Sequence, residues 1–176
     1  MDQLAGVPDI REWVLQRYIE HPLLIQNGHK FHLRVYALCV GALKVYVFDK
    51  ILMLIAACKY CLDDLDNIYA HLTNTARAAE NLTFDEKKFV QLLDDLPHHL
   101  MRYCSDRVSD LNTAYKIVDN IYSQVHSITG ELFKAFENEY TIFCPMTNCF
   151  EIYGLDYLVD ADFNVYLLEV NPGGIL

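Results

Sequence analysis

Three oxygen-bearing side chains near the end of the sequence could bind a divalent metal ion. They are Asp156, Glu169 and Asn171, and each lies on or just after an apolar segment typical of a β-strand. Glu169 and Asn171 are two positions apart, so on a strand their side chains project from the same face. Carboxylate and amide oxygens suit Mg²⁺, which binds one or two carboxylates together with waters and substrate phosphates. The spacing therefore predicts a magnesium site with all three residues as ligands.

Two strands joined by a short polar turn must position these ligands. We expect the strands over residues 150–160 and 163–171. In an antiparallel hairpin, residues equidistant from the turn face one another. Asp156 should therefore lie opposite either Glu169 or Asn171.

A second polar face is predicted on the strand of residues 30–40. Alternation places Lys30, His32, Arg34 and Tyr36 on one face and apolar side chains on the other. Neighbouring basic side chains repel one another, so either the strand is a solvated edge or an anion lies above this face. We favour the anion.

The remaining pattern predicts an α+β fold, an antiparallel β-sheet with flanking helices. Further strands are expected at residues 13–19, 23–25, 43–49 and 51–57. A capping box at residues 83–86 predicts a helix that Pro97 ends or kinks. A second apolar stripe predicts a helix from about Ser105 to Tyr122 or beyond, with an interruption near residues 129–130.

The composition argues for one folded domain. The chain has 176 residues, of which 53% are hydrophobic, and this is enough to form a core. The formal charge of −10 and the lack of a basic patch argue against a nucleic-acid partner. No apolar stretch reaches the ~20 residues that cross a bilayer, so no membrane association is expected. Six cysteines without a secretion signal indicate free thiols and a cytoplasmic location, and the lone CxxC at Cys58 and Cys61 does not suffice for a zinc site.

Four stretches, in this order, resemble the tubulin-tyrosine ligase family of the ATP-grasp superfamily. Residues 13–25 are similar to its hinge strand, and Lys-Phe-His-Leu-Arg at 30–34 is similar to its Lys-Phe-Asp-Leu-Arg motif. Residues 71–74 read His-Leu-Thr-Asn, as in the family. Gly-Leu-Asp at 154–156 and Leu-Glu-Val-Asn at 168–171 resemble its pair of metal-binding strands. The resemblance spans nearly the whole chain and implies the C-terminal half of an ATP-grasp fold.

The resemblance implies an ATP- and Mg²⁺-dependent ligase. Such an enzyme joins a free amino acid to a protein, of which tubulin is the candidate, through an acyl-phosphate intermediate. The residues implied at the nucleotide are Gln16, Arg17, Tyr18, Ile19, Lys30, His32, Thr73 and Asn74. Arg34 would hold the phosphate or the intermediate, and Asp156, Glu169 and Asn171 would bind Mg²⁺. Arg34 and Glu169 are thus the implied catalytic residues.

Two positions depart from the family pattern. His32 stands where the motif has an aspartate, and Leu54 stands where many members have an arginine that grips the carboxylate of the amino-acid substrate. We also expect the chain to lack the N-terminal ATP-grasp subdomain and to be similar to a divergent branch that is sometimes joined to a SurE-type phosphatase domain. These departures leave open the alternative of a non-catalytic protein-interaction module, or of an inactive fragment of that fold.

Overall fold

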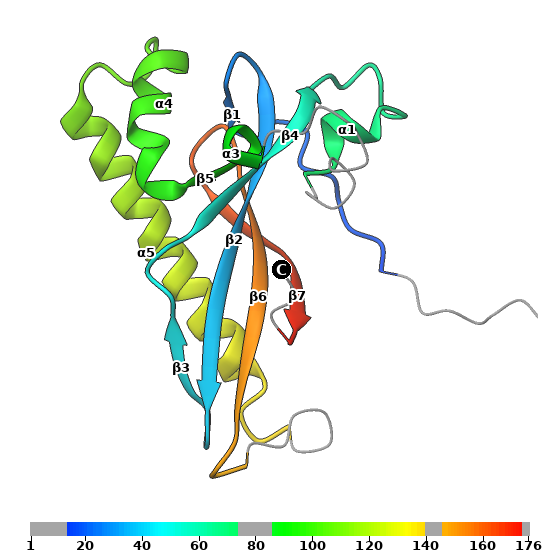
Figure 1. Ribbon diagram of the computed structural model, residues 1–176, viewed down its shortest axis with the longest axis vertical. Helices are drawn as coiled ribbons and strands as arrows, with labels where there is room; N and C mark the ends of the chain where they lie inside the picture. Colours follow the sequence, from blue (N-terminus) through cyan, green and yellow to red (C-terminus); the bar gives the residue numbers. More distant parts are fainter. Residues whose placement is uncertain (1–13, 74–85, 140–145, 174–176) are drawn as a thin grey trace, which may run out of the picture.

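The computed structural model describes residues 14–73, 86–139 and 146–173. Within them, seven strands form an antiparallel sheet in the order β5-β4-β2-β6-β7, with β1 and β3 also paired to β2 (Figure 1). The strands are β1 (Leu24–Ile25), β2 (His29–Val40), β3 (Lys44–Val47), β4 (Leu52–Lys59), β5 (Val90–Leu92), β6 (Phe150–Val159) and β7 (Val165–Pro172). The helices are α1 (Ile68–His71), α3 (Glu86–Phe89), the 3₁₀ turn η1 (Leu93–Asp95), α4 (Leu96–Tyr103) and α5 (Leu111–Ala135). The predicted α+β class is confirmed.

The long strand β2 lies at the centre of the sheet and separates the core from the polar face. Its apolar residues Phe31, Leu33 and Val35 are at most 1% exposed and belong to the hydrophobic core. Helices α4 and α5 cover this apolar face, and α1 lies on the opposite side of the sheet (Figure 1). The alternation in the sequence therefore predicted correctly which side chains of β2 face the core and which form the polar face, because side chains on a strand point alternately to its two faces.

Helix α5 is longer than predicted and begins later. Asp110 is its N-cap, because its side chain accepts a hydrogen bond from the backbone N–H of Thr113. The predicted interruption near residues 129–130 is wrong. Thr129 donates a hydrogen bond to the Val125 carbonyl and is also hydrogen-bonded to the Tyr157 hydroxyl, both at 2.7 Å. These bonds satisfy the buried hydroxyl, so the helix continues past Gly130 to Ala135.

The single helix expected from the capping box to Pro97 is also wrong. Residues 86–89 form one helical turn, and the chain then enters β5, which pairs with β4. Pairing along β4 outweighs the local helical pattern, since a sheet edge gains backbone hydrogen bonds that a short helix would forgo. Pro97 lies in the first turn of α4 rather than at a helix end, a position where its missing N–H has no cost. Residues 83–85 of the capping box lie outside the described part of the chain.

The strand expected at residues 13–19 is wrong where the structure describes it. Residues 14–19 form no strand, and the side chains of Val14 and Leu15 are 84% and 100% exposed. The side chain of Gln16 donates a hydrogen bond to the Leu168 carbonyl of β7 at 3.3 Å. The segment thus runs beside the polar face of the sheet without joining it.

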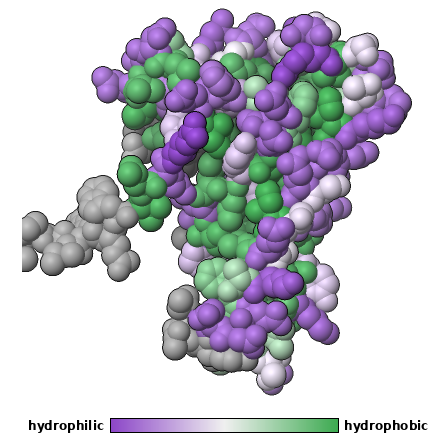
Figure 2. Space-filling view, turned by 180° about the vertical axis from the view of Figure 1, so that it is seen from behind, coloured by the Kyte–Doolittle hydropathy of each residue, from purple (hydrophilic) through white to green (hydrophobic). Residues whose placement is uncertain are grey.

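The surface is not uniformly polar. Viewed from behind, hydrophobic residues form a band down the middle of the molecule, between hydrophilic margins (Figure 2). At the end of β2 that lies between β3 and the start of β6, four large apolar side chains are more than 40% exposed: Tyr46, Phe48, Phe150 and Ile152. Among the described residues, no helix combines the length and hydropathy that a bilayer span requires.

Candidate functional site

A cavity of about 500 Å³ opens between the polar face of the sheet and residues 16–19. The predicted site residues that line it are Gln16, Arg17, Tyr18, Ile19, Lys30, His32, Arg34, Thr73, Asp156 and Glu169. Asn171 lies on β7 but does not line the cavity, and Asn74 lies outside the described residues. The sequence motifs therefore converge in space, although they are spread over more than 150 positions.

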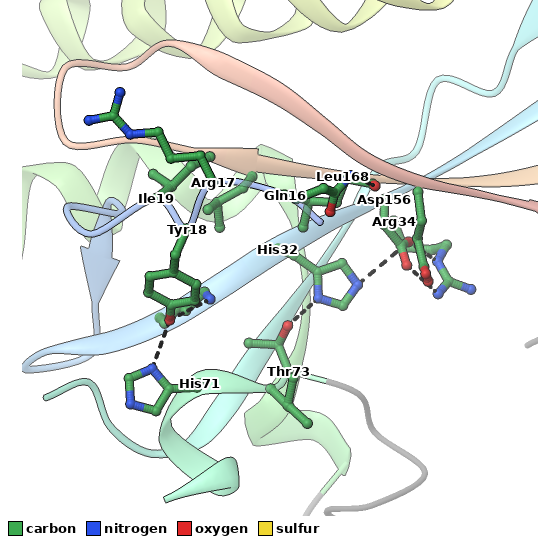
Figure 3. A pocket seen from close by; sticks show the side chains of 14 residues that line it. Gln16, Arg17, Tyr18, Ile19, His32, Arg34, His71, Thr73, Asp156 and Leu168 are labelled. Carbon is green, nitrogen blue, oxygen red and sulfur yellow. Dashed lines mark hydrogen bonds and ion pairs between the residues drawn. The ribbon is translucent and has the colours of Figure 1, made fainter. Parts of the chain in front are cut away.

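An ion pair joins Arg34 and Asp156 in the cavity (Figure 3). The two residues face each other on β2 and β6. Nε of Arg34 donates to Oδ1 of Asp156 at 2.5 Å, and Nη2 donates to Oδ2 at 3.0 Å. A β-carbon added at Gly154 would lie 3.5 Å from Nη1, so the guanidinium rests against this glycine. Both carboxylate oxygens of Asp156 are thus bound by one guanidinium.

Asp156 is charged although it is only 6% exposed. Burial by itself would raise the pKa of its carboxyl group, but the neighbouring His32 and Arg34 outweigh burial and lower the pKa to about 2. Burial alone would lower the pKa of Arg34, but the partner carboxylate raises it on balance. The pair is therefore fully ionised at neutral pH.

His32 connects Asp156 to the loop that follows α1. Its Nδ1 is hydrogen-bonded to the hydroxyl of Thr73. Its Nε2 points toward Oδ1 of Asp156 at 3.6 Å, too long for a hydrogen bond. Among the described residues, this buried Nε2 has no hydrogen-bond partner. Arg34 thus holds the carboxylate while His32 stands close to it.

Lys30 is held by a second network that the sequence did not predict. Its ammonium donates to the Tyr18 hydroxyl at 3.2 Å and lies 4.8 Å from the centre of the Tyr18 ring. The Tyr18 hydroxyl is 2.7 Å from Nδ1 of His71, whose Nε2 lies 3.0 Å from the carbonyl of Asp64. Because a carbonyl only accepts, Nε2 donates to Asp64. Lys30 donates to the Tyr18 hydroxyl, whose own proton is left to point toward Nδ1 of His71. His71 lines the cavity but was not predicted as a site residue. Its position two residues before Thr73 could have indicated it.

The C-terminal hairpin forms as predicted. Strands β6 and β7 pair antiparallel, and Asp156 lies opposite Glu169 rather than Asn171, which faces Gly154. The amide of Asn171 donates a hydrogen bond to Oε1 of Glu169 at 2.9 Å. Of the three predicted ligands, only the two carboxylates line the cavity.

A comparison with known protein families finds one that matches nearly the whole chain. The sequence model of the tubulin-tyrosine ligase family matches residues 1–172. The chain belongs to the tubulin-tyrosine ligase family.

Relatives within this family carry two kinds of name. A "Probable tubulin--tyrosine ligase" of Schizosaccharomyces pombe is 36% identical over 169 residues, covering 94% of this chain and 36% of that protein. One of Saccharomyces cerevisiae is 33% identical, covering 95% of this chain and 22% of that protein. A "Probable tubulin polyglutamylase" of Rattus norvegicus is 30% identical, covering 97% of this chain and 34% of that protein. The chain therefore spans about a third or less of these relatives.

The donor set suits the Mg²⁺ that the tubulin-tyrosine ligase family implies. Asp156 and Glu169 face each other across paired strands and line one cavity, and carboxylate oxygens are preferred Mg²⁺ ligands. The described residues hold no group of three His, Cys, Asp or Glu side chains able to bind a metal ion. A metal here would thus have two protein carboxylates, of which Asp156 is engaged by Arg34.

Both departures from the tubulin-tyrosine ligase pattern lie on the polar face. His32 on β2 and Leu54 on β4 are paired residues, so their side chains project to the same side of the sheet. Leu54 is 8% exposed. An apolar side chain therefore occupies the position at which the resemblance implies an arginine, next to the residue that stands in place of the aspartate.

Proposed function

We propose that this chain is the nucleotide- and metal-binding part of an ATP-dependent ligase, which joins an amino acid to a protein through an acyl phosphate. The observation that carries the proposal is the charge arrangement of the cavity. The cations Lys30 and Arg34 and the carboxylates Asp156 and Glu169 line the same space of about 500 Å³. Phosphoryl transfer depends mainly on positioning and charge neutralisation, which such a set of residues can supply.

Each wall of the cavity has a role in this proposal. Residues 16–19 flank the adenine, and Lys30, held in place by Tyr18, binds a phosphate oxygen. Arg34 orients the transferred phosphoryl group, and Thr73 lies near the phosphates. Asp156 and Glu169, with Asn171 supporting Glu169, hold Mg²⁺. When bound, Mg²⁺ supplies charge neutralisation for the phosphoryl group.

The protein substrate that we propose is tubulin, because the relatives are named as ligases and polyglutamylases of tubulin. The second substrate is a free amino acid, and the buried Leu54 stands where the resemblance implies an arginine for its carboxylate. An apolar residue there favours an amino acid recognised through other groups than a carboxylate–guanidinium pair. We place the reaction in the cytoplasm, where the five described cysteines, all free, would remain reduced.

Thermal unfolding of the full chain with and without Mg-ATP tests the proposal. A ligand that binds only the folded state stabilises it by about 2.7 kcal/mol at 100 times its Kd. We expect such stabilisation for the wild type and its loss in Glu169→Gln, which removes the charge but keeps the shape. The matched control is Glu131→Gln, on the exposed side of α5, which should respond like the wild type.

The alternative, a non-catalytic module, is favoured by one observation. Leu54 and His32 replace charged residues of the family pattern at adjacent positions of the site face. Cooperative unfolding of the wild type that Mg-ATP leaves unchanged would support this alternative and reject the ligase.

A further inference from the structure

The carboxylate of Asp156 would have to bind two cations, Arg34 and Mg²⁺. Arg34 occupies both of its oxygens, and the proposed function requires one of those oxygens for Mg²⁺. A guanidinium bonded to both oxygens occupies the lone pairs that face it, and it repels a second cation at the same buried carboxylate. Arg34 therefore has to move away from Asp156 for that carboxylate to bind a metal with its full charge.

We propose that Arg34 makes the site selective for the metal–nucleotide complex over either component alone, through an exchange of partners at Asp156. A phosphate group draws the guanidinium of Arg34 away, and the carboxylate so released becomes a metal ligand. This inference rests on the proposed function and names how that same site discriminates its ligand.

The position of Arg34 allows the exchange. Its side chain runs along Gly154 on the site face of β6 and lines the same cavity as Lys30 (Figure 3). Guanidinium groups bind phosphate and carboxylate with the same two-pronged geometry. Rotation of one side chain therefore replaces Asp156 by a phosphate without moving β2.

His32 supports Asp156 after Arg34 has left. Nε2 of His32 has no hydrogen-bond partner among the described residues, although the side chain is only 8% exposed, and Oδ1 of Asp156 is the acceptor 3.6 Å away. A small rotation of the carboxylate brings Oδ1 within hydrogen-bond distance of Nε2. One oxygen of Asp156 would then bond to His32 and the other would face the cavity.

The exchange couples the two ligands. Metal alone must break the Arg34–Asp156 pair without offering Arg34 a new partner, and nucleotide alone leaves Asp156 without its cation. When both bind, the phosphate gives Arg34 a new partner, and the metal gives Asp156 a new cation. Coupling of this kind is reciprocal, so each ligand raises the affinity for the other by the same factor.

Binding measurements on the full chain test the exchange, with Mn²⁺ as the metal probe and ATP in EDTA as the metal-free nucleotide. For the wild type, we expect ATP to raise the affinity for Mn²⁺ by about ten-fold or more. Arg34→Gln should bind Mn²⁺ alone several-fold more tightly than the wild type and lose most of the coupling. Lys30→Gln, a matched loss of charge in the same cavity, should weaken ATP binding and change the affinity for Mn²⁺ alone much less.

The outcomes separate this inference from the proposed function. Equal affinity of wild type and Arg34→Gln for Mn²⁺ alone overturns the exchange, and so does a wild-type Mn²⁺ affinity that stays the same when ATP is bound. Should Arg34→Gln fail to fold, Arg34→Lys, which keeps the charge but not the two-pronged contact, should show an intermediate increase in Mn²⁺ affinity, and no increase overturns the exchange. If no nucleotide binds under any condition, the proposed function fails, and tighter Mn²⁺ binding by Arg34→Gln would still support competition for Asp156.

Discussion

At the scale of single residues, the state of Asp156 depends on two side chains of β2. His32 and Arg34 are two positions apart, so both lie on the site face, and both approach the same carboxylate. The family motif has an aspartate in place of His32, which would place a negative charge where this chain has an imidazole. We therefore expect residue 32 to influence how strongly the site attracts cations.

Replacing His32 with aspartate tests this dependence. In His32→Asp, a second carboxylate would lie near Asp156, and like charges at short distance destabilise the metal-free site. We expect the free energy of unfolding in EDTA to fall by roughly 1–3 kcal/mol and the affinity for Mn²⁺ to rise. Denaturant unfolding and metal titration measure the two effects. His126→Asp, on the exposed side of α5, is the control and should change neither. Unchanged metal affinity in His32→Asp would mean that residue 32 does not act on the cation.

At the scale of elements, the sheet is fixed to α5 by apolar packing and a small polar contact. The residues of α5 that face the core are Ala114, Val118, Ile121, Val125, Thr129 and Phe133. Phe133 meets the Tyr153 ring edge to face at 5.3 Å, and Thr129 bonds to the Tyr157 hydroxyl. Both tyrosines are on β6, the strand that also carries Asp156. The helix therefore holds from behind the strand that forms the site.

The variant Thr129→Val tests how much the polar contact between α5 and β6 contributes to stability. The hydroxyl of Thr129 donates to Val125, so the Tyr157 hydroxyl donates to Thr129, and valine would leave that buried donor without an acceptor. An unsatisfied buried group costs about 1–3 kcal/mol, and we expect a destabilisation of this size in denaturant unfolding. Ser127→Ala, on the exposed side of the same helix, should change stability little. A neutral Thr129→Val would show that another group satisfies Tyr157.

The turn between β6 and β7 predicts a pH dependence. Oδ1 of Asp160 accepts from the backbone N–H groups of Asp162 and Asn164, and Oδ2 accepts from the Tyr166 hydroxyl. Burial would raise the pKa of Asp160, but these hydrogen bonds lower it on balance. A carboxyl with a lowered folded-state pKa stabilises the protein above its unfolded pKa of ~3.9, and this contribution is lost as the pH falls through the folded value.

The comparison of wild type with Asp160→Asn checks the sign. The wild type should lose more stability than the variant as the pH falls below about 4, and the difference should be constant between about pH 6 and 8. Equal slopes of stability against pH in the acid range would show that Asp160 does not titrate differently in the folded state.

At the scale of the whole molecule, the cavity has one firm wall and one loosely held wall. The firm wall is the sheet, backed by a continuous core. The loosely held wall is residues 16–19, part of the segment 14–19 that lies outside the sheet and is largely exposed. Segments with few buried contacts open at low free energy. A ligand between the two walls should therefore order this segment more than any other described part.

Hydrogen exchange measures this ordering. Backbone amides of residues 14–19 should exchange fast without ligand and become protected when Mg-ATP is added, while the amides of α5 should show no change. Nucleotide binding detected by unfolding but without protection of residues 14–19 would place the ligand away from this segment.

Much of the site could be predicted from the sequence because its signals are local. Alternation along residues 30–36 assigned the faces of β2, and the apolar runs around Asp156 and Glu169 predicted the hairpin that places them opposite each other. The order of the family motifs added residues 16–19 and Thr73, which line the cavity. These features depend on neighbours in the chain or on the period of a strand, and a sequence contains both.

Three features were decided only by the tertiary structure. Residues 90–92 form a strand because β4 offers them an edge, and residues 14–19 form none although their composition suits one. The ion pair of Arg34 and Asp156 joins residues 122 positions apart, and it exists because β2 and β6 are neighbours in register. Pairing energy depends on which strands meet and at what offset, and no local property of the sequence specifies either. The sequence predicted most of the residues that line the cavity, and the fold determined which of them bind one another.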